Sequence, residues 1–195
     1  MPRIDPLPRA DLAEFEETFQ LIESANGFVP NSLYTMARVP GLMPAFMNVV
    51  RTVFFNGLIS PELVQLVALM ASSGSGCRYC QAHTSTAAAH AGVDPDKVAA
   101  VWEFETDDRF SDAERAALRL AFHAGQVPNA ATDDDFAACR KHYTDDQLAA
   151  IVATISTFGY LNRWNDTVAT ELEGLPHQFA TDTLGPQGWT PGNHT

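Results

Sequence analysis

Residues 60–92, SPELVQLVALMASSGSGCRYCQAHTSTAAAHAG, decide the fold of the chain. Apolar residues at helical spacing predict a helix over Pro61–Ala71. The small residues 72–76 are expected to break that helix, and an alanine-rich helix that stops before a glycine is predicted over Arg78–Ala91. The two cysteines of this stretch would therefore lie where a loop enters a helix.

This position favours thiol chemistry, because the first turn of a helix has unpaired N–H groups and the positive end of the helix dipole. In Cys-x-x-Cys settings the pKa of a thiol can fall from about 8.5 to roughly 3.5–7.5. Cys77 and Cys80 share one helical face and lie close enough to bridge. His83 follows at the same spacing, and Arg78 adds a positive charge. A nucleophile, a partner thiol and a base near one another are what thiol-dependent redox catalysis requires.

The composition limits the partners and the compartment. The 195 residues carry 12 basic and 24 acidic side chains, a formal net charge of −12, which argues against binding to nucleic acid or to an anionic membrane. No apolar run approaches the roughly 18 residues of a transmembrane helix, and the first residues hold no apolar signal core. Three cysteines are an odd number, unlike a secreted disulfide framework. We therefore expect a cytoplasmic protein, in which a Cys-x-x-Cys pair is more often redox-active or metal-binding than structural.

The rest of the chain also predicts helices. Capping boxes, in which Ser or Thr is followed three residues later by Glu or Gln, begin at Ser111 and Thr144. The alternating patterns typical of strands are missing. The fold class is therefore all-α, with about nine helices in a single domain of residues 1–195. Residues 1–9 are expected to form an extended arm and residues 174–195 an irregular tail. The further predicted helices cover residues 10–24, 31–38, 40–55, 95–102, 111–125, 132–142 and 144–172.

A longer pattern around the thiols resembles a known superfamily. The run Cys77-Arg78-Tyr79-Cys80-Gln81-Ala82-His83, with a polar residue twelve positions before it on a helix, is similar to the carboxymuconolactone decarboxylase/alkylhydroperoxidase D superfamily, and most of all to its peroxidase-related branch. Segments 110–114, 143–147 and 158–164 look like the corresponding parts of that family. The resemblance covers roughly residues 30–172.

The resemblance implies an all-α, AhpD-like bundle that assembles as a homo-oligomer, a trimer or a multiple of it. It also implies a peroxidase in which Cys80 attacks a hydroperoxide and becomes a sulfenic acid, which Cys77 then resolves as a disulfide. A glutamate and a histidine would relay protons, and an external dithiol would reduce the disulfide. No flavin, haem or metal would be needed, and neither nucleic acid nor a membrane is an expected partner.

Two positions depart from the family pattern. The relay glutamate is replaced by Gln65, which can orient a group through hydrogen bonds but cannot accept a proton. Glu62, one turn earlier on roughly the same helix face, is the candidate substitute. The family histidine often follows the second cysteine by four residues, where this chain has Thr84, whereas His83 lies one position earlier, as in the peroxidase-related branch. The candidate catalytic residues are therefore Cys80, Cys77, His83, Glu62 and Gln65.

The thiol pair has two other possible roles, as buried small side chains or as zinc ligands. Structural zinc takes four ligands in a tetrahedron, which a single helix wraps poorly. Tyr79 is expected to pack rather than to donate to a sulfenate, and Cys139 is expected to be inert. Asn162 and Arg163 are expected to cap, and to pair with acids across a subunit interface. The nominal zinc ligands are Cys77, Cys80, His83 and His90.

Three functions from different classes follow from these residues. The preferred one is a thiol-dependent (alkyl)hydroperoxidase or disulfide oxidoreductase. The second is a redox-sensing or structural oligomer without appreciable turnover. The third is a lyase of the carboxymuconolactone decarboxylase type with His83 and Glu62 as acid and base, although the decarboxylase members lack the cysteine pair.

Overall fold

The structure, a computed structural model, describes residues 1–195 and confirms the all-α fold, with ten α-helices, three short 3₁₀ helices and no strand. None of the helices combines the length and the apolarity that a membrane crossing requires. In chain order the elements are η1 (Arg9–Phe15), α1 (Glu16–Asn26), α2 (Asn31–Met36), α3 (Leu42–Phe54), α4 (Pro61–Ser75), α5 (Arg78–His90), α6 (Pro95–Ala99), η2 (Val101–Glu103), α7 (Asp112–Gly125), α8 (Asp133–Cys139), α9 (Asp145–Val168), α10 (Gly174–Thr183) and η3 (Gly185–Gln187).

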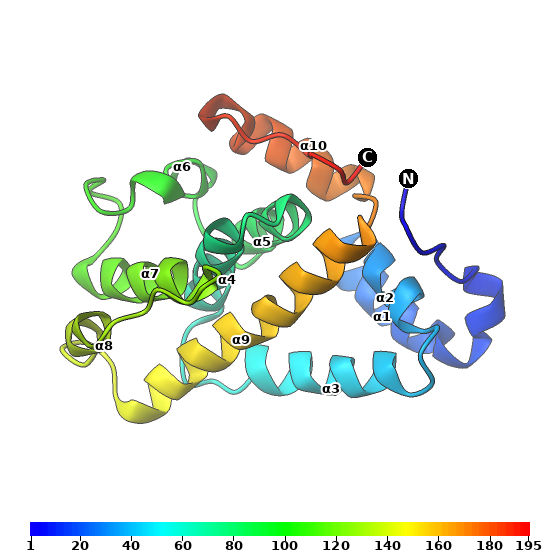
Figure 1. Ribbon diagram of the computed structural model, residues 1–195, viewed down its shortest axis with the longest axis horizontal. Helices are drawn as coiled ribbons and strands as arrows, with labels where there is room; N and C mark the ends of the chain where they lie inside the picture. The colour runs from blue at the N-terminus through cyan, green and yellow to red at the C-terminus, as the bar shows by residue number, and fades with distance from the viewer.

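Helix α4 is the centre of the larger hydrophobic core. It packs against α5, α7 and α9, and the long helix α9 crosses the molecule between α5 and α3 (Figure 1). Because α4 has neighbours on several sides, its apolar residues are buried almost all the way round, as a helix in the middle of a bundle requires. Five of them are completely inaccessible, namely Leu66, Val67, Ala68, Leu69 and Ala71.

A smaller core lies between η1, α1, α2 and α3. Leu161 and Trp164 of α9 pack against it, and Leu161 also packs against the larger core. The indole N–H of Trp164 donates to Thr35 Oγ1 at 3.1 Å. Helix α9 is therefore the element that joins the two cores. Nothing in this arrangement separates the chain into independent parts, but the single domain stays a prediction.

Helix α4 does not break at residues 72–76, as the sequence pattern predicts, but continues to Ser75 and ends at Gly76 with φ of 80°. The small residues at its C-terminal end allow α7 to pack against α4 at close range. A Cβ atom at Gly74 would lie 2.2 Å from the carbonyl oxygen of Phe122, and one at Gly125 would lie 2.3 Å from that of Ala71. Glycine here permits helix contact rather than a helix end.

The capping boxes are confirmed at Ser111 and at Thr144, where α7 and α9 begin. At each site the side chain accepts from the backbone N–H three residues later, and the Glu114 or Gln147 side chain accepts in return from the cap residue. These local signals set the helix starts as the sequence predicts.

The chain after α9 differs from the sequence prediction. Helix α9 ends at Val168, before Ala169 with φ of 53°, rather than near residue 172. Residues 174–195 are not an irregular tail throughout, because α10 and η3 form there and α10 packs on α5. The last residues return beside α9, where the N–H of Leu172 donates to the carbonyl of His194 at 3.0 Å. Figure 1 shows the two termini close together, and the Met1 amine donates to the Thr195 carbonyl at 2.9 Å.

Candidate active site

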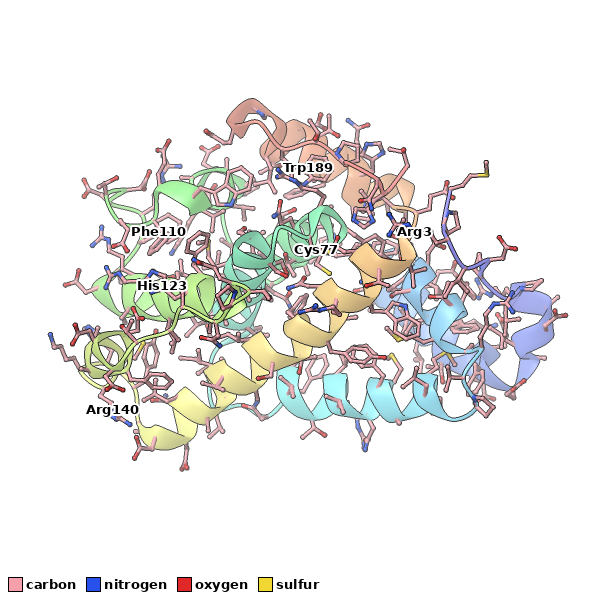
Figure 2. All side chains as sticks on the ribbon, viewed as in Figure 1. Arg3, Cys77, Phe110, His123, Arg140 and Trp189 are labelled. Atoms are coloured by element: carbon pink, nitrogen blue, oxygen red, sulfur yellow. The ribbon has the colours of Figure 1, made fainter.

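Cys77 and Cys80 lie at the loop-to-helix junction that the sequence predicts. Cys77 is the N-cap of α5, and its Sγ accepts from the backbone N–H of Cys80 at 3.5 Å. Both are free thiols and both are buried, with 0% and 2% of their surface exposed. Figure 2 shows the Cys77 side chain at the start of α5 on the side of α9. The two sulfurs therefore share one helical turn inside the protein.

The surroundings of Cys80 are polar on the side of α9. The Nδ2 amide of Asn165 donates to the Sγ of Cys80 at 3.5 Å. Asn162 lies one turn earlier on α9, and both residues are buried, with 1% and 0% exposed. The Oδ1 of Asn165 and both amide atoms of Asn162 have no hydrogen-bond partner. Because a buried polar group without a partner is costly, such groups commonly mark a functional position.

His83 pairs with a carboxylate that the sequence pattern does not single out. Its Nε2 donates to Glu173 Oε2 at 2.6 Å, and its ring stacks on Tyr79 with centroids 4.2 Å apart. The other carboxylate oxygen of Glu173 accepts from the hydroxyl of Tyr79 at 2.9 Å and from the backbone N–H of Asn31 at 2.5 Å. Tyr79 therefore packs, as predicted, and also donates a hydrogen bond.

The charges and hydrogen bonds around Glu173 keep its carboxylate ionised. Burial acts to raise the pKa of Glu173, but the charge and hydrogen bond of His83 and the backbone N–H of Asn31 outweigh it and hold the pKa below its ordinary value. Burial and the adjacent carboxylate raise the pKa of Tyr79 well above its usual range, so its hydroxyl stays a donor. The result is a buried carboxylate that holds His83 in place and can take up a proton from it.

A second buried group surrounds Cys77. The sulfur of Cys77, a carboxylate oxygen of Asp166 and a ring nitrogen of His194 lie within 4.8 Å of one another. His194 has 1% of its surface exposed. Its Nδ1 donates to the carbonyl of Thr170 at 2.8 Å, and its Nε2 donates to Asp166 Oδ1 at 3.1 Å.

The helix start predicts a lowered thiol pKa, but at Cys77 the opposite holds. Burial and the neighbouring Cys80 thiol raise the pKa of Cys77 well above its ordinary value, because an ionised sulfur there would lose its hydration, while the hydrogen bond to His194 opposes the rise. Burial alone would lower the pKa of His194. Its hydrogen bonds to Asp166, Cys77 and the Thr170 carbonyl reverse this effect and raise it to about 9.

Neither Glu62 nor Gln65 is hydrogen-bonded to a thiol or to His83. A Cβ atom at Gly92, beyond the far end of α5, would lie 3.9 Å from the Glu62 carboxylate, and Cys80 lies about 15 Å of helix away from that end. Glu62 instead lines a cavity with Lys97. Gln65 is half-buried on α4, and no hydrogen bond connects it to either thiol or to His83. The carboxylate that is hydrogen-bonded to His83 is Glu173.

The remaining candidates are separated from the thiols or from one another. His90 is exposed at the end of α5 and His83 faces Glu173, so the four nominal zinc ligands do not gather around one point. Arg163 is exposed, whereas Asn162 on the same helix is buried, and their predicted pairing across a subunit interface stays a prediction. Burial and the charge of Asp135 raise the pKa of Cys139 to about 11, which favours the inert role predicted for it.

A cavity of about 290 Å³ lies beside the first turn of α5, and Arg78 and Gln81 contribute to its wall. Neither cysteine lines it. The side chains of Arg78 and Gln81 are hydrogen-bonded to each other at 3.2 Å. Because Cys80 is 2% exposed, a substrate that reaches it must be small, or a segment packed over the thiols must move.

The residues that the sequence pattern misses all come from the C-terminal end of α9 and beyond. Asn165 and Asp166 lie within a long helix, where polar residues usually face solvent. Glu173 and His194 lie in non-periodic sequence, where no pattern predicts a contact. The only chemical signal was weak: two acids and two histidines are spread over residues 173–195, after the last predicted helix.

The fold and the site define an all-α protein with two free thiols buried at the start of one helix. The profile of the carboxymuconolactone decarboxylase family matches residues 40–122. A crystal structure of the debrominase Bmp8, a cysteine-to-alanine variant in complex with 2,3,4-tribromopyrrole, is 33% identical, has a TM-score of 0.86 and covers 91% of this chain and 95% of its own. The apo form of Bmp8 is 34% identical, with a TM-score of 0.85 and coverage of 91% and 96%.

Two other proteins extend the comparison. An uncharacterized peroxidase-related protein from Ralstonia eutropha, with an alkylhydroperoxidase AhpD core, has a TM-score of 0.77 at 21% identity, with coverage of 92% of this chain and 95% of its own. The uncharacterized protein YdfG of Bacillus subtilis is 28% identical over 103 residues, which are 52% of this chain and 67% of YdfG. The chain therefore belongs to the carboxymuconolactone decarboxylase/AhpD-like superfamily.

Proposed function

We propose that the protein is a thiol-dependent oxidoreductase in which Cys77 and Cys80 together deliver two electrons to a small electrophilic substrate. The observation that carries this proposal is the juxtaposition of the two free thiols, with the Sγ of Cys77 against the backbone N–H of Cys80. A thiol pair within one turn can close a disulfide without a large movement of the backbone. A hydroperoxide is the first substrate class that we propose.

In the first step the thiolate of Cys80 attacks the terminal oxygen of the hydroperoxide. An S–O bond forms and the O–O bond breaks, and the alkoxide takes a proton and leaves as an alcohol. In the second step Cys77 attacks the sulfur of the Cys80 sulfenic acid. The S–S bond forms, the S–O bond breaks, and hydroxide leaves as water with the proton of the Cys77 thiol. An external dithiol then reduces the disulfide.

Other groups near the thiols support particular steps of this reaction. The amide N–H of Asn165, directed at the Cys80 sulfur, is suited to stabilise a thiolate or a sulfenate. His83 with Glu173 and Tyr79 forms a buried network that can supply a proton to the leaving oxygen. Glu173 rather than Glu62 is therefore the carboxylate that we assign to the proton relay.

A second candidate is reductive dehalogenation of a small aromatic ring. It is favoured by the likeness to the debrominase Bmp8, which at 33–34% identity spans nearly the whole chain and was crystallised with a brominated pyrrole. The electron balance is the same: two thiols and one carbon–bromine compound give the hydrogen-substituted ring, bromide, a proton and the disulfide. Both candidates therefore depend on the same thiol pair and differ in the group that Cys80 attacks.

The assembly is also part of the proposal. We propose a homo-oligomer, because apolar side chains stand exposed on α3 and α9, which pack against each other. Phe55, just after α3, is 79% exposed, and Val49 of α3 is 46% exposed. Tyr160 on α9 is 37% exposed. A second copy of the chain could cover this apolar surface, which light scattering of the purified protein would test.

The test follows the thiols themselves. Reduced protein is mixed with cumene hydroperoxide or with 2,3,4-tribromopyrrole, and peroxide consumption or bromide release is measured. The cysteines are then mapped after trypsin cleavage at Arg78, Lys97, Arg119 and Arg140, which places Cys77, Cys80 and Cys139 on three different peptides. With at least one of the two substrates, the Cys77 and Cys80 peptides should become joined by a disulfide. The Cys139 peptide should stay reduced.

Three cysteine variants test the role proposed for each thiol. Cys80→Ser should lower substrate consumption at least about a hundredfold, because the nucleophile is lost. Cys77→Ser should allow one step only and leave a sulfenic acid that dimedone traps in the peroxide reaction. Cys139→Ser is the matched control and should react as the wild type does. If Cys80→Ser consumes either substrate at the wild-type rate, the proposed function is wrong for that substrate.

A further inference from the structure

The buried His194 lies in the C-terminal segment, which we define as residues 184–195. Leu184 and Trp189 of this segment are buried, with 0% and 4% exposed, and they fix it against the rest of the protein. The carbonyl of His194 accepts from Leu172, and its own N–H donates to Pro191. Figure 2 shows Trp189 beside α10. The segment is thus held in place both before His194 and at the backbone of His194 itself.

The hydrogen bonds of the His194 ring define its chemical form. Nδ1 faces the carbonyl oxygen of Thr170 and Nε2 faces the carboxylate of Asp166, and both oxygens are acceptors. A neutral imidazole has only one N–H and would leave one nitrogen lone pair against an oxygen lone pair. Only the doubly protonated ring satisfies both contacts. The structure therefore places an imidazolium next to the sulfur of Cys77.

We propose that His194 is a positioning residue for Cys77, and that the C-terminal segment brings it into the thiol site to stabilise the thiolate of the resolving cysteine. This inference deepens the proposed function and rests on it for the redox steps. In disulfide formation the Cys77 thiolate is the attacking sulfur. In reduction of the disulfide by an external dithiol that attacks Cys80, the Cys77 thiolate is the leaving group. An imidazolium beside that sulfur favours both steps, because a nearby positive charge stabilises the negative charge on a thiolate.

The other groups that face Cys77 make this assignment specific. Cys80 lies on the same helical turn and raises the pKa of Cys77, as does the carboxylate of Asp166 from α9. Tyr79 approaches the His194 ring, with ring centroids 5.8 Å apart, but stays a neutral phenol. Arg78 directs its guanidinium to Gln81. His194 is thus the cation in position to offset the burial of the sulfur.

The test measures the ionisation of Cys77 without any substrate. Reduced full-length protein is alkylated with iodoacetamide from pH 6 to pH 11, and the tryptic peptide that ends at Arg78 reports Cys77 alone. The midpoint of the pH profile is compared between wild type, His194→Ala and His90→Ala. The midpoint is used because easier access to the sulfur changes the maximal rate but leaves the midpoint in place.

We expect the Cys77 midpoint to rise by about one pH unit or more in His194→Ala, and to return toward the wild-type value when imidazole is added to fill the space of the lost ring. His90→Ala, which removes an exposed histidine at the far end of α5, should leave the midpoint unchanged. An unchanged midpoint in His194→Ala, or one that imidazole does not restore, would assign His194 a purely structural role and overturn the proposal.

A second measurement on the wild-type protein covers the case in which His194→Ala fails to fold. The ring of His194 is titrated by nitrogen NMR in the reduced protein and in the Cys77–Cys80 disulfide form. Because the hydrogen bond to Cys77 helps to raise the pKa of His194, we expect a lower midpoint once Cys77 is locked in a disulfide. Equal midpoints would contradict the proposal. Neither measurement needs peroxide, so a protein that turns over no substrate can still confirm or refute the role of His194.

Discussion

The site has two halves that differ in how they are encoded. The first half, residues 61–90 of α4 and α5, is one continuous helical hairpin that supplies both thiols and His83. The second half, residues 162–194, follows them by about a hundred positions and supplies the groups that surround them. The hairpin holds the reacting atoms, while Asn165, Asp166, Glu173 and His194 set their charge and orientation. A motif can therefore identify the chemistry of a site and still leave out the residues that tune it.

The largest expected effect comes from removing the carboxylate beside His83, compared with removing the one that the sequence pattern suggested. Glu173→Ala should lower the free energy of unfolding by roughly 3–5 kcal/mol, because His83, Tyr79 and the Asn31 N–H lose a buried charged partner. Glu62→Ala is the matched control and should change it by no more than about 0.5 kcal/mol, because its carboxylate lines an open cavity. Urea unfolding measures both.

The reverse ranking would show that Glu62, not Glu173, completes the site. A similar loss in both variants would instead indicate a general sensitivity of the bundle. The same two variants should also separate in the reaction, where only Glu173→Ala is expected to slow the protonation of the leaving group.

The second prediction concerns the hairpin itself and its contact with α7. Gly74→Ala should cost about 1–3 kcal/mol of stability or more, because its Cβ would overlap the carbonyl oxygen of Phe122, a backbone atom that cannot rotate away. Gly159→Ala on α9 is the control, since nothing lies within 4 Å of its Cβ position, and it should be neutral or stabilising by up to about 1 kcal/mol. Thermal unfolding that shifts equally in both variants would contradict the close crossing of α4 and α7.

The fold was predictable from local patterns to a large extent. The positions of most helices follow from apolar spacing and from capping residues such as Ser111 and Thr144, which act within one turn. The exceptions are places where a distant contact decides. Helix α4 continues through Gly74 because a glycine without a side chain lets α7 pack closely against it. Helix α10 forms in a glycine- and proline-rich segment because it can pack on α5.

The candidate site was predictable only as far as it is local. Cys77, Cys80 and His83 are linked by spacing within one helix, so the sequence alone places them together. The carboxylate partner of His83 depends on how the chain turns after α9, where Ala169 adopts a positive φ and ends the helix. No spacing rule connects Glu173 or His194 to α5, and the sequence pattern therefore points to a glutamate on α4 for the relay.

The third prediction uses pH to separate the contributions of His194 and Glu173 to stability. The pKa of His194 is raised in the folded protein from 6.5 to about 9, so the stability it contributes is complete below pH 6.5 and is lost as the pH rises through about 9. The pKa of Glu173 is lowered, so its contribution is present above about pH 4.5 and is lost as the pH falls through the folded value.

We therefore expect the melting temperature to fall by a few degrees on each side of this range. In His194→Gln the decrease on the alkaline side should be smaller, while the acidic side should remain as in the wild type. An alkaline decrease that is identical in the variant would mean that other groups cause it. Differential scanning calorimetry between about pH 2 and pH 10 measures both limits.

The smallest expected effect tests whether the second half of the site acts on Cys80 as well as on Cys77. Asn165→Ala removes the amide that donates to the Cys80 sulfur at 3.5 Å. A hydrogen bond of this kind contributes about 0.5–1.5 kcal/mol, so alkylation of Cys80 at neutral pH should slow by a factor of about two to ten. Arg163→Ala, exposed on the same helix, is the control and should leave the rate unchanged. The tryptic peptide that begins at Tyr79 reports Cys80 separately from Cys77. If reactivity is lost at Cys77 alone, α9 acts on the site only through Asp166 and His194. The thiolate of Cys80 would then depend on the start of α5.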